Sequence, residues 1–99
     1  MRFEWDDTKD RSNFTKHKLS FETARLVFDD PLAVSVPDRV VAGEERWQTL
    51  GRVDGMIVFL VAHTYRSQGE DEVVQIVSAR KATPRELRFY EQAQHTTNE

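Results

Sequence analysis

Cysteine is absent from the 99-residue chain, which excludes disulfides, thiolate catalysis and cysteine-ligated zinc. A long hydrophobic run is absent too, because the longest apolar stretch, residues 56–62, is far shorter than the ~20 residues of a membrane-spanning helix. The N-terminal segment lacks the apolar core of a secretory signal. We therefore expect a cytoplasmic protein with no membrane partner, folded as one domain over residues 1–94 with a flexible tail at residues 95–99.

Several sequence motifs of enzymes are also missing. The chain has none of GxxxxGK[ST], GxGxxG, HExxH or GxSxG, which are typical of phosphate-binding loops, dinucleotide sites, zinc proteases and serine hydrolases. Its three histidines, His17, His63 and His95, do not follow the spacing of a metal site. We therefore expect neither a metal ion nor a cofactor.

Positive charge is in the minority, with 14 Lys+Arg against 17 Asp+Glu and a net charge of −3. This balance argues against a general coating of nucleic acid, but it leaves room for a local basic face. One segment, SARKATPRELRFYE at residues 78–91, gathers cationic side chains. Such a concentration in an acidic chain suggests a contact with an anion.

The hydrophobic pattern changes from a helical period to a strand period along the chain. It predicts helices from Asp6 or Asp7 to about Lys18, from Ser20 to the segment before Pro31, and from Thr83 to about Gln94. It predicts strands at residues 2–5, 32–36, 46–53, 56–66 and 72–80, with an exposed loop at residues 37–45. Hairpin connections imply an α+β fold. Its antiparallel sheet has about four strands plus the short N-terminal one, flanked by two N-terminal helices and one C-terminal helix.

The hairpin turns allow the strands to be aligned. If Asp54 and Gly55 are the two turn residues, Arg46 lies opposite His63. Arg66 lies toward the same end of the sheet, although alternation places it on the other face unless a bulge or strand end turns it. A histidine with two arginines would suit a phosphate. The alternative, which the spacing alone favours, is a partly satisfied strand histidine beside two solvated arginines.

The basic segment lies at the other end of that strand pair. The alignment places Arg80 near Val58, far from Arg66. In the last helix Arg85 and Arg88 share one face, which either attracts phosphate or carboxylate groups or is an ordinary solvated face. We expect Glu86 to complete a capping box with Thr83, rather than to act as a base.

A polar stripe runs along the first predicted helix. Its residues, which follow helical spacing, are Asp6, Lys9, Asn13, Lys16 and His17. The stripe could hold a partner, or it could be a hydrogen-bonded seam against the sheet. For His17 the pattern favours a structural role over a catalytic one.

Four blocks of the sequence resemble the BrnT family of toxins from bacterial type II toxin–antitoxin systems. The blocks are FEWDDTKDRSNFTKHKLSFETARLVFDDP, GEERWQTLG, VAHTYR and IVSARKATPRELRFYE, in the order of the family. The resemblance implies a RelE-like fold and a ribonuclease that cuts RNA and stops translation. It also implies a cognate BrnA-like ribbon-helix-helix antitoxin that neutralises the toxin. Operator DNA would be contacted only through the antitoxin.

The family's motifs can be placed on this chain residue by residue. The matching positions are Lys16, His17, Arg46, His63, Arg66, Ser78, Arg80, Lys81, Glu86 and Tyr90. The sequence departs from the family pattern at Arg52, where a small hydroxyl residue is more usual. The turn at residues 67–71 is also more acidic than usual, which could weaken the approach of RNA at that edge.

These positions suggest a metal-independent endoribonuclease in which arginines hold the phosphate and His63, Glu86, Tyr90 or a lysine moves protons. The expected catalytic residues are Arg46, His63, Arg66, Arg80, Glu86 and Tyr90. The expected contacts with RNA or antitoxin are Lys9, Lys16, His17, Lys81, Arg85 and Arg88. Two alternatives stay open, a non-catalytic protein-binding module such as a degenerate toxin, and an RNA binder without turnover.

Overall fold

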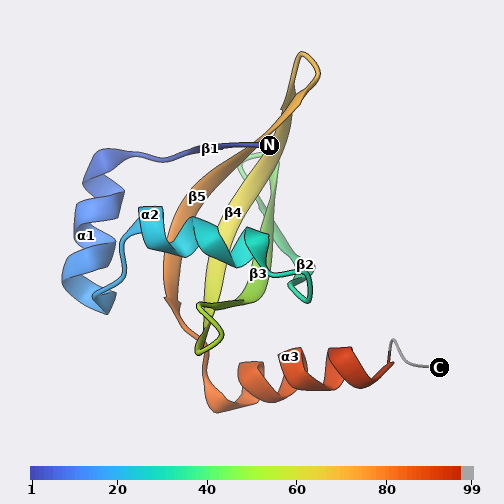
Figure 1. The fold of residues 1–99 in the computed structure, drawn as a ribbon. Coiled ribbons are helices and arrows are strands. Elements are labelled where there is room, and N and C mark those ends of the chain that lie inside the picture. Colours follow the sequence, from blue (N-terminus) through green and yellow to red (C-terminus); the bar gives the residue numbers. More distant parts are fainter. Residues whose placement is uncertain (97–99) are drawn as a thin grey trace.

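A computed structural model describes residues 1–96 as one sheet with helices around it (Figure 1). The strands are β1 (Arg2–Glu4), β2 (Val34–Val41), β3 (Glu44–Val53), β4 (Ile57–Gln68) and β5 (Asp71–Lys81). The helices are α1 (Asp7–His17), α2 (Phe21–Ala24), the 3-10 helix η1 (Arg25–Asp29) and α3 (Pro84–Thr96). Helix α3 includes the first two residues of the predicted tail, and residues 97–99 lie outside the described residues.

The strands form a single sheet in the order β1-β5-β4-β3-β2. Each of the strands β2 to β5 pairs antiparallel with the next one along the sequence, because short turns join them. Strand β1 instead pairs parallel to β5, with Arg2 opposite Val73, an orientation that the sequence pattern did not predict. A parallel neighbour is possible here because the chain between the two strands is long. The predicted α+β fold is confirmed, with a mixed sheet.

The exposed loop predicted at residues 37–45 is wrong. Strand β2 continues through most of this segment, and a tight turn at Ala42 and Gly43 leads into β3. Both turn residues have positive φ, 51° and 80°, which matches the right-handed twist of the flanking strands. Pro37 is tolerated because β2 is an edge strand whose register shifts between Pro37 and Arg39.

The turn between β3 and β4 contains three residues, 54–56, and not the two that the sequence pattern suggests. The additional residue moves the register of the strand pair by one position. Trp47 therefore lies opposite His63, and the predicted pairing of Arg46 with His63 is wrong. Because side chains alternate along a strand, this slip moves Arg46 to the face opposite that of His63.

Strand β5 contains a β-bulge at Val77. Ala62 pairs with Ser78, but the next residue of β4, His63, pairs with Ile76, so Val77 has no partner of its own. The regular alternation of side chains is interrupted at this point of β5.

Arg80 lies opposite Leu60 and not near Val58 as predicted, because the β4–β5 turn and the bulge each shift the register by one position. Arg66 is six positions from Leu60 along β4. At ~3.4 Å per residue, this places the two arginines on the order of 20 Å apart along the strands. The predicted separation of Arg66 and Arg80 is confirmed.

Helices α2 and η1 lie across one face of the sheet, which we call the packed face (Figure 1). Its fully buried apolar residues are Phe21, Ala24, Val27, Val61, Val74, Ile76 and Ala79. The helical segment approaches β3 closely at Gly51, where an added Cβ would lie 2.6 Å from both Cβ and the carbonyl oxygen of Val27. Glycine at this position therefore allows the two backbones to meet.

Helix α1 lies beside β5 and is held there by one buried amide (Figure 1). The Asn13 side chain accepts a hydrogen bond from Ala79 N–H (3.1 Å) and donates to the Ala79 carbonyl (2.9 Å). It also donates to the carbonyl of Leu19. The amide replaces a neighbouring strand at this edge of β5, which confirms the predicted hydrogen-bonded seam for Asn13.

Helix α3 packs on the opposite face of the sheet, but only at one corner (Figure 1). Its buried Tyr90 and partly buried Leu87 contact Leu50, Val58 and Leu60. The rest of that face is left without a helix. In the described part of the chain, no helix is long and apolar enough to cross a membrane.

Candidate functional site

The part of the sheet beyond α3 is lined by polar and cationic side chains, and we call it the open face. Strand alternation and register place on it the residues Arg46, Gln48, Ala62, Thr64, Arg66, Gln75, Ser78 and Arg80. Glu4 of β1 shares this face because it pairs with Gln75. Most of these side chains are partly or fully exposed. Three of the five arginines that the family pattern and the basic segment single out therefore lie on one accessible surface.

At one end of the open face Arg66 forms an ion pair with Glu4. Arg46 lies one residue beyond the paired Trp47, and its buried Nε has no hydrogen-bond partner among the described residues. The hydroxyl of Thr64, which is 1% exposed, is likewise without a partner there. Two buried polar groups without partners indicate that this end can form further hydrogen bonds, with the Arg46 Nε–H as a donor.

At the other end Arg80 holds Glu86 through two hydrogen bonds. Nη1 donates to Oε1 at 2.8 Å, and Nη2 donates to Oε2 at 3.0 Å. The hydrogen bonds from Arg80 lower the pKa of Glu86 and outweigh the opposite effect of burial. The same pairing raises the pKa of Arg80. Arg80 is therefore a firmly held cation at the edge of α3.

The capping box predicted for the last helix is confirmed. Thr83 N–H donates to the Glu86 carboxylate at 2.9 Å, and Glu86 N–H donates to the Thr83 hydroxyl at 3.2 Å. Glu86 thus binds the helix terminus and Arg80 at once. This fixes the start of α3 beside the end of β5.

His63 lies on the packed face and is fully buried. Its Nε2 is 2.7 Å from the hydroxyl of Thr49, which is 2.7 Å from the hydroxyl of Ser35. The rings of Phe28 and Tyr65 pack against the imidazole at 5.0 and 4.8 Å between centroids. Burial lowers the pKa of His63 to about 4, so the ring is neutral at physiological pH. The structure does not bring His63 together with Arg46 and Arg66.

Tyr90 is also enclosed, with 3% of its surface exposed. Its hydroxyl donates to the carboxylate of Asp30, which also accepts from the backbone N–H groups of Arg52 and Leu32. Burial raises the pKa of Tyr90, and the hydrogen bond to Asp30 raises it further. For Asp30, burial raises the pKa, but the hydrogen bonds and the charge of Arg52 outweigh it and leave a lowered value. Tyr90 thus fastens α3 to the end of η1.

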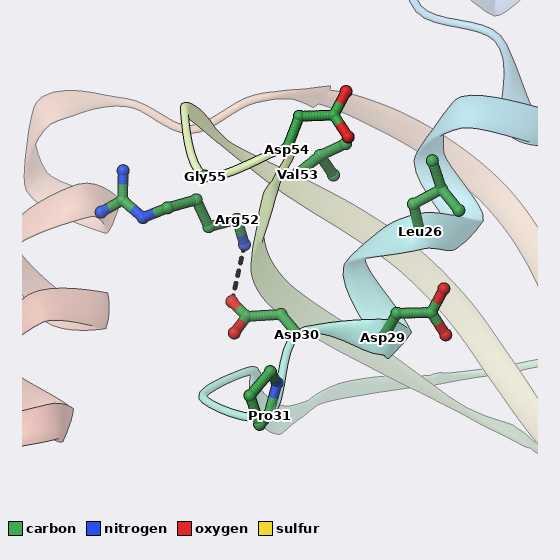
Figure 2. Close-up of a pocket in the computed structure, with 8 residues that line it drawn as sticks. All are labelled: Leu26, Asp29, Asp30, Pro31, Arg52, Val53, Asp54 and Gly55. Atoms are coloured by element: carbon green, nitrogen blue, oxygen red, sulfur yellow. Dashed lines mark hydrogen bonds between the residues drawn. The ribbon is translucent and has the colours of Figure 1, made fainter.

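A cleft of about 340 Å³ lies on the side of this contact, between η1 and the turn after β3 (Figure 2). Figure 2 shows the carboxylate of Asp30 directed at Arg52, while the carboxylates of Asp29 and Asp54 point elsewhere. Among the side chains that the structure describes, residues 1–94, there is no group of three or more arranged to hold a metal ion. We find no ligand-binding arrangement in this cleft.

Two other hollows contain four of the six residues predicted to contact RNA or antitoxin. Lys9, Lys16 and His17 of α1 line one groove together with Ser12, Asn13, Val77 and Ser78. Arg85 lines a second groove, between α3 and the β2–β3 hairpin. Lys81 and Arg88 are exposed and line neither of these two grooves.

Counting along strands missed Glu4, Gln48 and Gln75 as members of the open face. The predicted two-residue turn after β3 gave the wrong face for that strand, and the parallel pairing of β1 with β5 was not foreseen. Correct strand alternation would have found Gln48 and Gln75. No sequence pattern places Glu4 on the open face, beyond its position in a short predicted strand.

Comparison with known proteins agrees with the fold. Residues 5–86 match the family model for the ribonuclease toxin, BrnT, of type II toxin-antitoxin systems. Among solved structures, the chain is similar to the Brucella abortus ribonuclease toxin BrnT, whose crystal structure was determined at 1.1 Å. The two chains are 28% identical with a TM-score of 0.59, and the alignment covers 84% of this chain and 97% of the other. No match was found among curated proteins. The chain belongs to the BrnT family of ribonuclease toxins of type II toxin–antitoxin systems.

Proposed function

We propose that this protein cleaves RNA on the open face of its sheet, without a metal ion, in the cytoplasm. The observation that carries the proposal is that Arg46, Arg66 and Arg80 come from three different strands and share one accessible face. Arginine binds phosphate through a planar set of donors, so three of them form a surface suited to an RNA backbone. No catalytic role is needed for a residue on the packed face.

In the proposed reaction the ribose 2′-oxygen attacks the adjacent phosphorus while its proton passes to a base. The bond to the 5′-oxygen breaks, and an acid returns a proton to that oxygen, leaving a 2′,3′-cyclic phosphate and a 5′-hydroxyl. Negative charge accumulates on the phosphate oxygens during the attack. Arg80 supplies the positive charge that stabilises it. Arg66 and Arg46, at the far end of the face, would instead hold another phosphate of a longer substrate.

We assign Glu86 as the proton acceptor. In the free protein its pKa is lowered because Arg80 donates two hydrogen bonds to it. A phosphate that draws Arg80 away would also remove this interaction, so the carboxylate would become a better base as the substrate binds. The capping box keeps Glu86 in place when Arg80 turns.

We give His63 and Tyr90 no part in the chemistry. The His63 ring is enclosed on the other face of the sheet, and the Tyr90 hydroxyl is occupied by Asp30. A residue that transfers a proton must come within hydrogen-bond reach of the reacting atoms. Both residues are instead buried and stabilise the packing of the elements that carry the arginines.

The partner that restrains this activity is, in our proposal, a BrnA-like ribbon-helix-helix antitoxin. A groove of about 230 Å³ beside Arg80 and Glu86 is lined by apolar residues, namely Val34, Val36, Leu50, Leu60 and Phe89, and by Arg85. Phe89 is 47% exposed. An amphipathic segment with acidic residues would cover the apolar lining and neutralise Arg85 and Arg88. Such a segment would also block access to Arg80.

The test is RNA cleavage by the purified protein in EDTA, beside Arg66→Ala, Arg80→Ala and the control Arg25→Ala. Arg25 forms a similar single ion pair, with Glu22, but lies in η1. Loss of Arg80 should lower the rate roughly 10²–10³-fold, and loss of Arg66, which would hold a more distant phosphate, should weaken substrate binding. The control should keep the wild-type rate. Equal rates in all four proteins would place the chemistry elsewhere. Intact RNA in every reaction, with ribosomes also present, would favour a non-catalytic antitoxin-binding module.

A further inference from the structure

The groove between α1 and β5 is built differently from the apolar groove beside α3. Its volume is about 270 Å³, and the side chains around it are two lysines, a histidine, two serines, the Asn13 amide and one valine. This lining is more polar than that of the groove beside α3, and cations and hydroxyl groups are the donors that bind a phosphate. The lining therefore fits a nucleic-acid backbone better than a protein partner.

The lysines of this groove are not neutralised by the protein itself. Neither Lys9 nor Lys16 forms an ion pair within the described residues, although five other cationic side chains of the chain do. Two of the acidic residues close to Lys9 in the sequence, Asp6 and Asp10, are bound to backbone groups. Asp6 accepts from the N–H groups at the start of the helix, and Asp10 accepts from Phe21 N–H.

The β-bulge explains how strand β5 contributes to the groove. In a regular strand Val77 and Ser78 would point to opposite faces, but the extra residue at Val77 lets both line the same hollow. Asn13 holds α1 at this point through the backbone of Ala79. The groove is thus fixed by buried hydrogen bonds and is not a chance gap between exposed side chains.

The groove adjoins the proposed active site. Ser78 and Arg80 are two positions apart on the same face of β5, a separation of about 7 Å. An RNA chain whose reacting phosphate is held by Arg80 would therefore pass its neighbouring backbone over Ser78 and toward α1. The RNA backbone would leave Arg80 along β5 toward α1, because the apolar groove lies on the other side of Arg80.

We propose that the α1–β5 groove binds a backbone phosphate of the RNA next to the phosphate that reacts, with Lys9 and Lys16 supplying the charge and Ser12 and Ser78 the hydroxyl donors. The proposal rests on the proposed ribonuclease function and adds a subsite that fixes the position of the substrate. Lys9 and Lys16 are positioning residues, since they contact a phosphate that is not cleaved.

The experiment measures binding of a short 2′-O-methyl RNA, which cannot be cleaved, to the full chain at several salt concentrations. The variants are Lys9→Gln/Lys16→Gln and Ser78→Ala, and the control is Arg11→Gln. Arg11 is an exposed cation of the same helix that does not line the groove. Loss of one cationic phosphate contact in the lysine variant should reduce the slope of log affinity against log salt by about 0.7, whereas the control keeps the wild-type slope. Ser78→Ala removes no charge, so it should weaken binding without changing the slope.

A second measurement locates the phosphate. Each phosphate of the oligonucleotide is replaced in turn by an uncharged methylphosphonate. Neutralising one position beside the cleavage position should weaken binding to the wild type and should add nothing in the Lys9→Gln/Lys16→Gln variant. Equal binding and equal slopes for that variant and for Arg11→Gln would overturn the proposal. Loss of antitoxin binding with unchanged RNA binding would likewise overturn it and identify a protein contact.

These outcomes are separate from those of the cleavage assay. If the wild type binds the oligonucleotide through the groove but cuts no RNA, the subsite stands and the ribonuclease assignment fails. If the wild type cuts RNA at the same rate as the lysine variant at low substrate concentration, the ribonuclease stands and the subsite fails. A true subsite should raise KM in the variant while kcat for bound substrate changes little.

Discussion

The two faces of the sheet use similar polar side chains in opposite ways. On the packed face His63 and Thr49 are fully buried and share a hydrogen bond, and a second hydrogen bond joins the Thr49 hydroxyl to that of Ser35. On the open face Thr64 lacks a partner among the described residues, and Arg66 is held only by an exposed ion pair. The packed face holds these side chains in a buried hydrogen-bonded network, although His63 Nδ1 has no partner among the described residues, whereas the open face leaves its cations accessible to solvent.

The accessible polar side chains of the open face are better placed to contact a substrate than the buried ones of the packed face. A histidine in a family motif attracts attention because its side chain titrates near neutrality, but the pKa of His63 is lowered by burial to about 4. Arginine and carboxylate groups that hold each other at the surface can exchange that contact for a substrate. We therefore expect substitutions on the packed face to lower stability, and substitutions on the open face to lower activity.

The largest effect should come from Gly51→Ala on the packed face. The new Cβ would lie 2.6 Å from Val27, so the helical segment must move away from β3. We expect the free energy of unfolding to fall by about 3 kcal/mol or more. The control is Ala62→Ser, which also adds one heavy atom but on the open face, and should change stability by less than about 0.5 kcal/mol. Urea unfolding of both variants measures this, and similar losses would contradict the comparison.

The next effect is a dependence of stability on pH that originates from His63. Above pH 6.5 the ring is neutral in both states and has no effect. Between pH 6.5 and about 4 the unfolded chain binds a proton that the folded chain excludes, so stability falls as pH falls. The total loss should be about 3 kcal/mol, complete below pH 4.

The matched variant for this pH effect is His63→Gln, whose amide can still bond the Thr49 hydroxyl but does not titrate. Its stability should be lower at pH 7 and should vary less between pH 6.5 and 4. Unfolding curves at half-unit intervals give both slopes. Parallel curves for the two proteins would show that His63 is not the group responsible.

A smaller effect, confined to activity, is expected for Glu86→Gln on the open face. Glutamine preserves the capping box of α3, but it removes the proposed proton acceptor and the ion pair with Arg80. The cleavage rate should fall roughly 10²-fold with only a small change in stability. Glu91→Gln, at an exposed position of the same helix, is the control. An unchanged rate for Glu86→Gln would leave the carboxylate with its structural role alone.

The smallest effect is expected for Tyr90→Phe. The variant loses the hydrogen bond to Asp30, which keeps those from the N–H groups of Arg52 and Leu32. We expect a loss of about 1.5 kcal/mol in stability and no change in the cleavage rate of the folded protein. A rate that drops tenfold while the variant remains folded would return Tyr90 to the catalytic residues.

The sequence predicted the elements better than it predicted their alignment. Capping residues such as Ser20 and Thr83 and the amphipathic patterns were sufficient to find the helices, because these signals are local. The alignment of β3 with β4 depends on whether a turn has two or three residues, which the Asp54–Gly55 pair does not decide. One residue of error moved Arg46 to the wrong face of the sheet.

The sequence also does not reveal which residues of α1 and β5 contact each other. The stripe on α1 was recognised, but only the structure shows that Asn13 bonds the backbone of Ala79 while Lys9 and Lys16 remain outside. The bulge at Val77 is likewise set by the contact with α1 and by the register of β4, and neither is local in sequence. Site residues could be named from the family pattern, but their grouping required the fold.

The parallel pairing of β1 with β5 has a consequence for how the protein is made. Arg2 pairs with Val73, so β1 can join the sheet only after most of the chain has left the ribosome. Until then Glu4 cannot reach Arg66, and the helix that carries Glu86 emerges later still. A nascent or prematurely terminated chain therefore lacks the assembled site that we propose, so the proposed activity would appear only after the C-terminal helix has been synthesised.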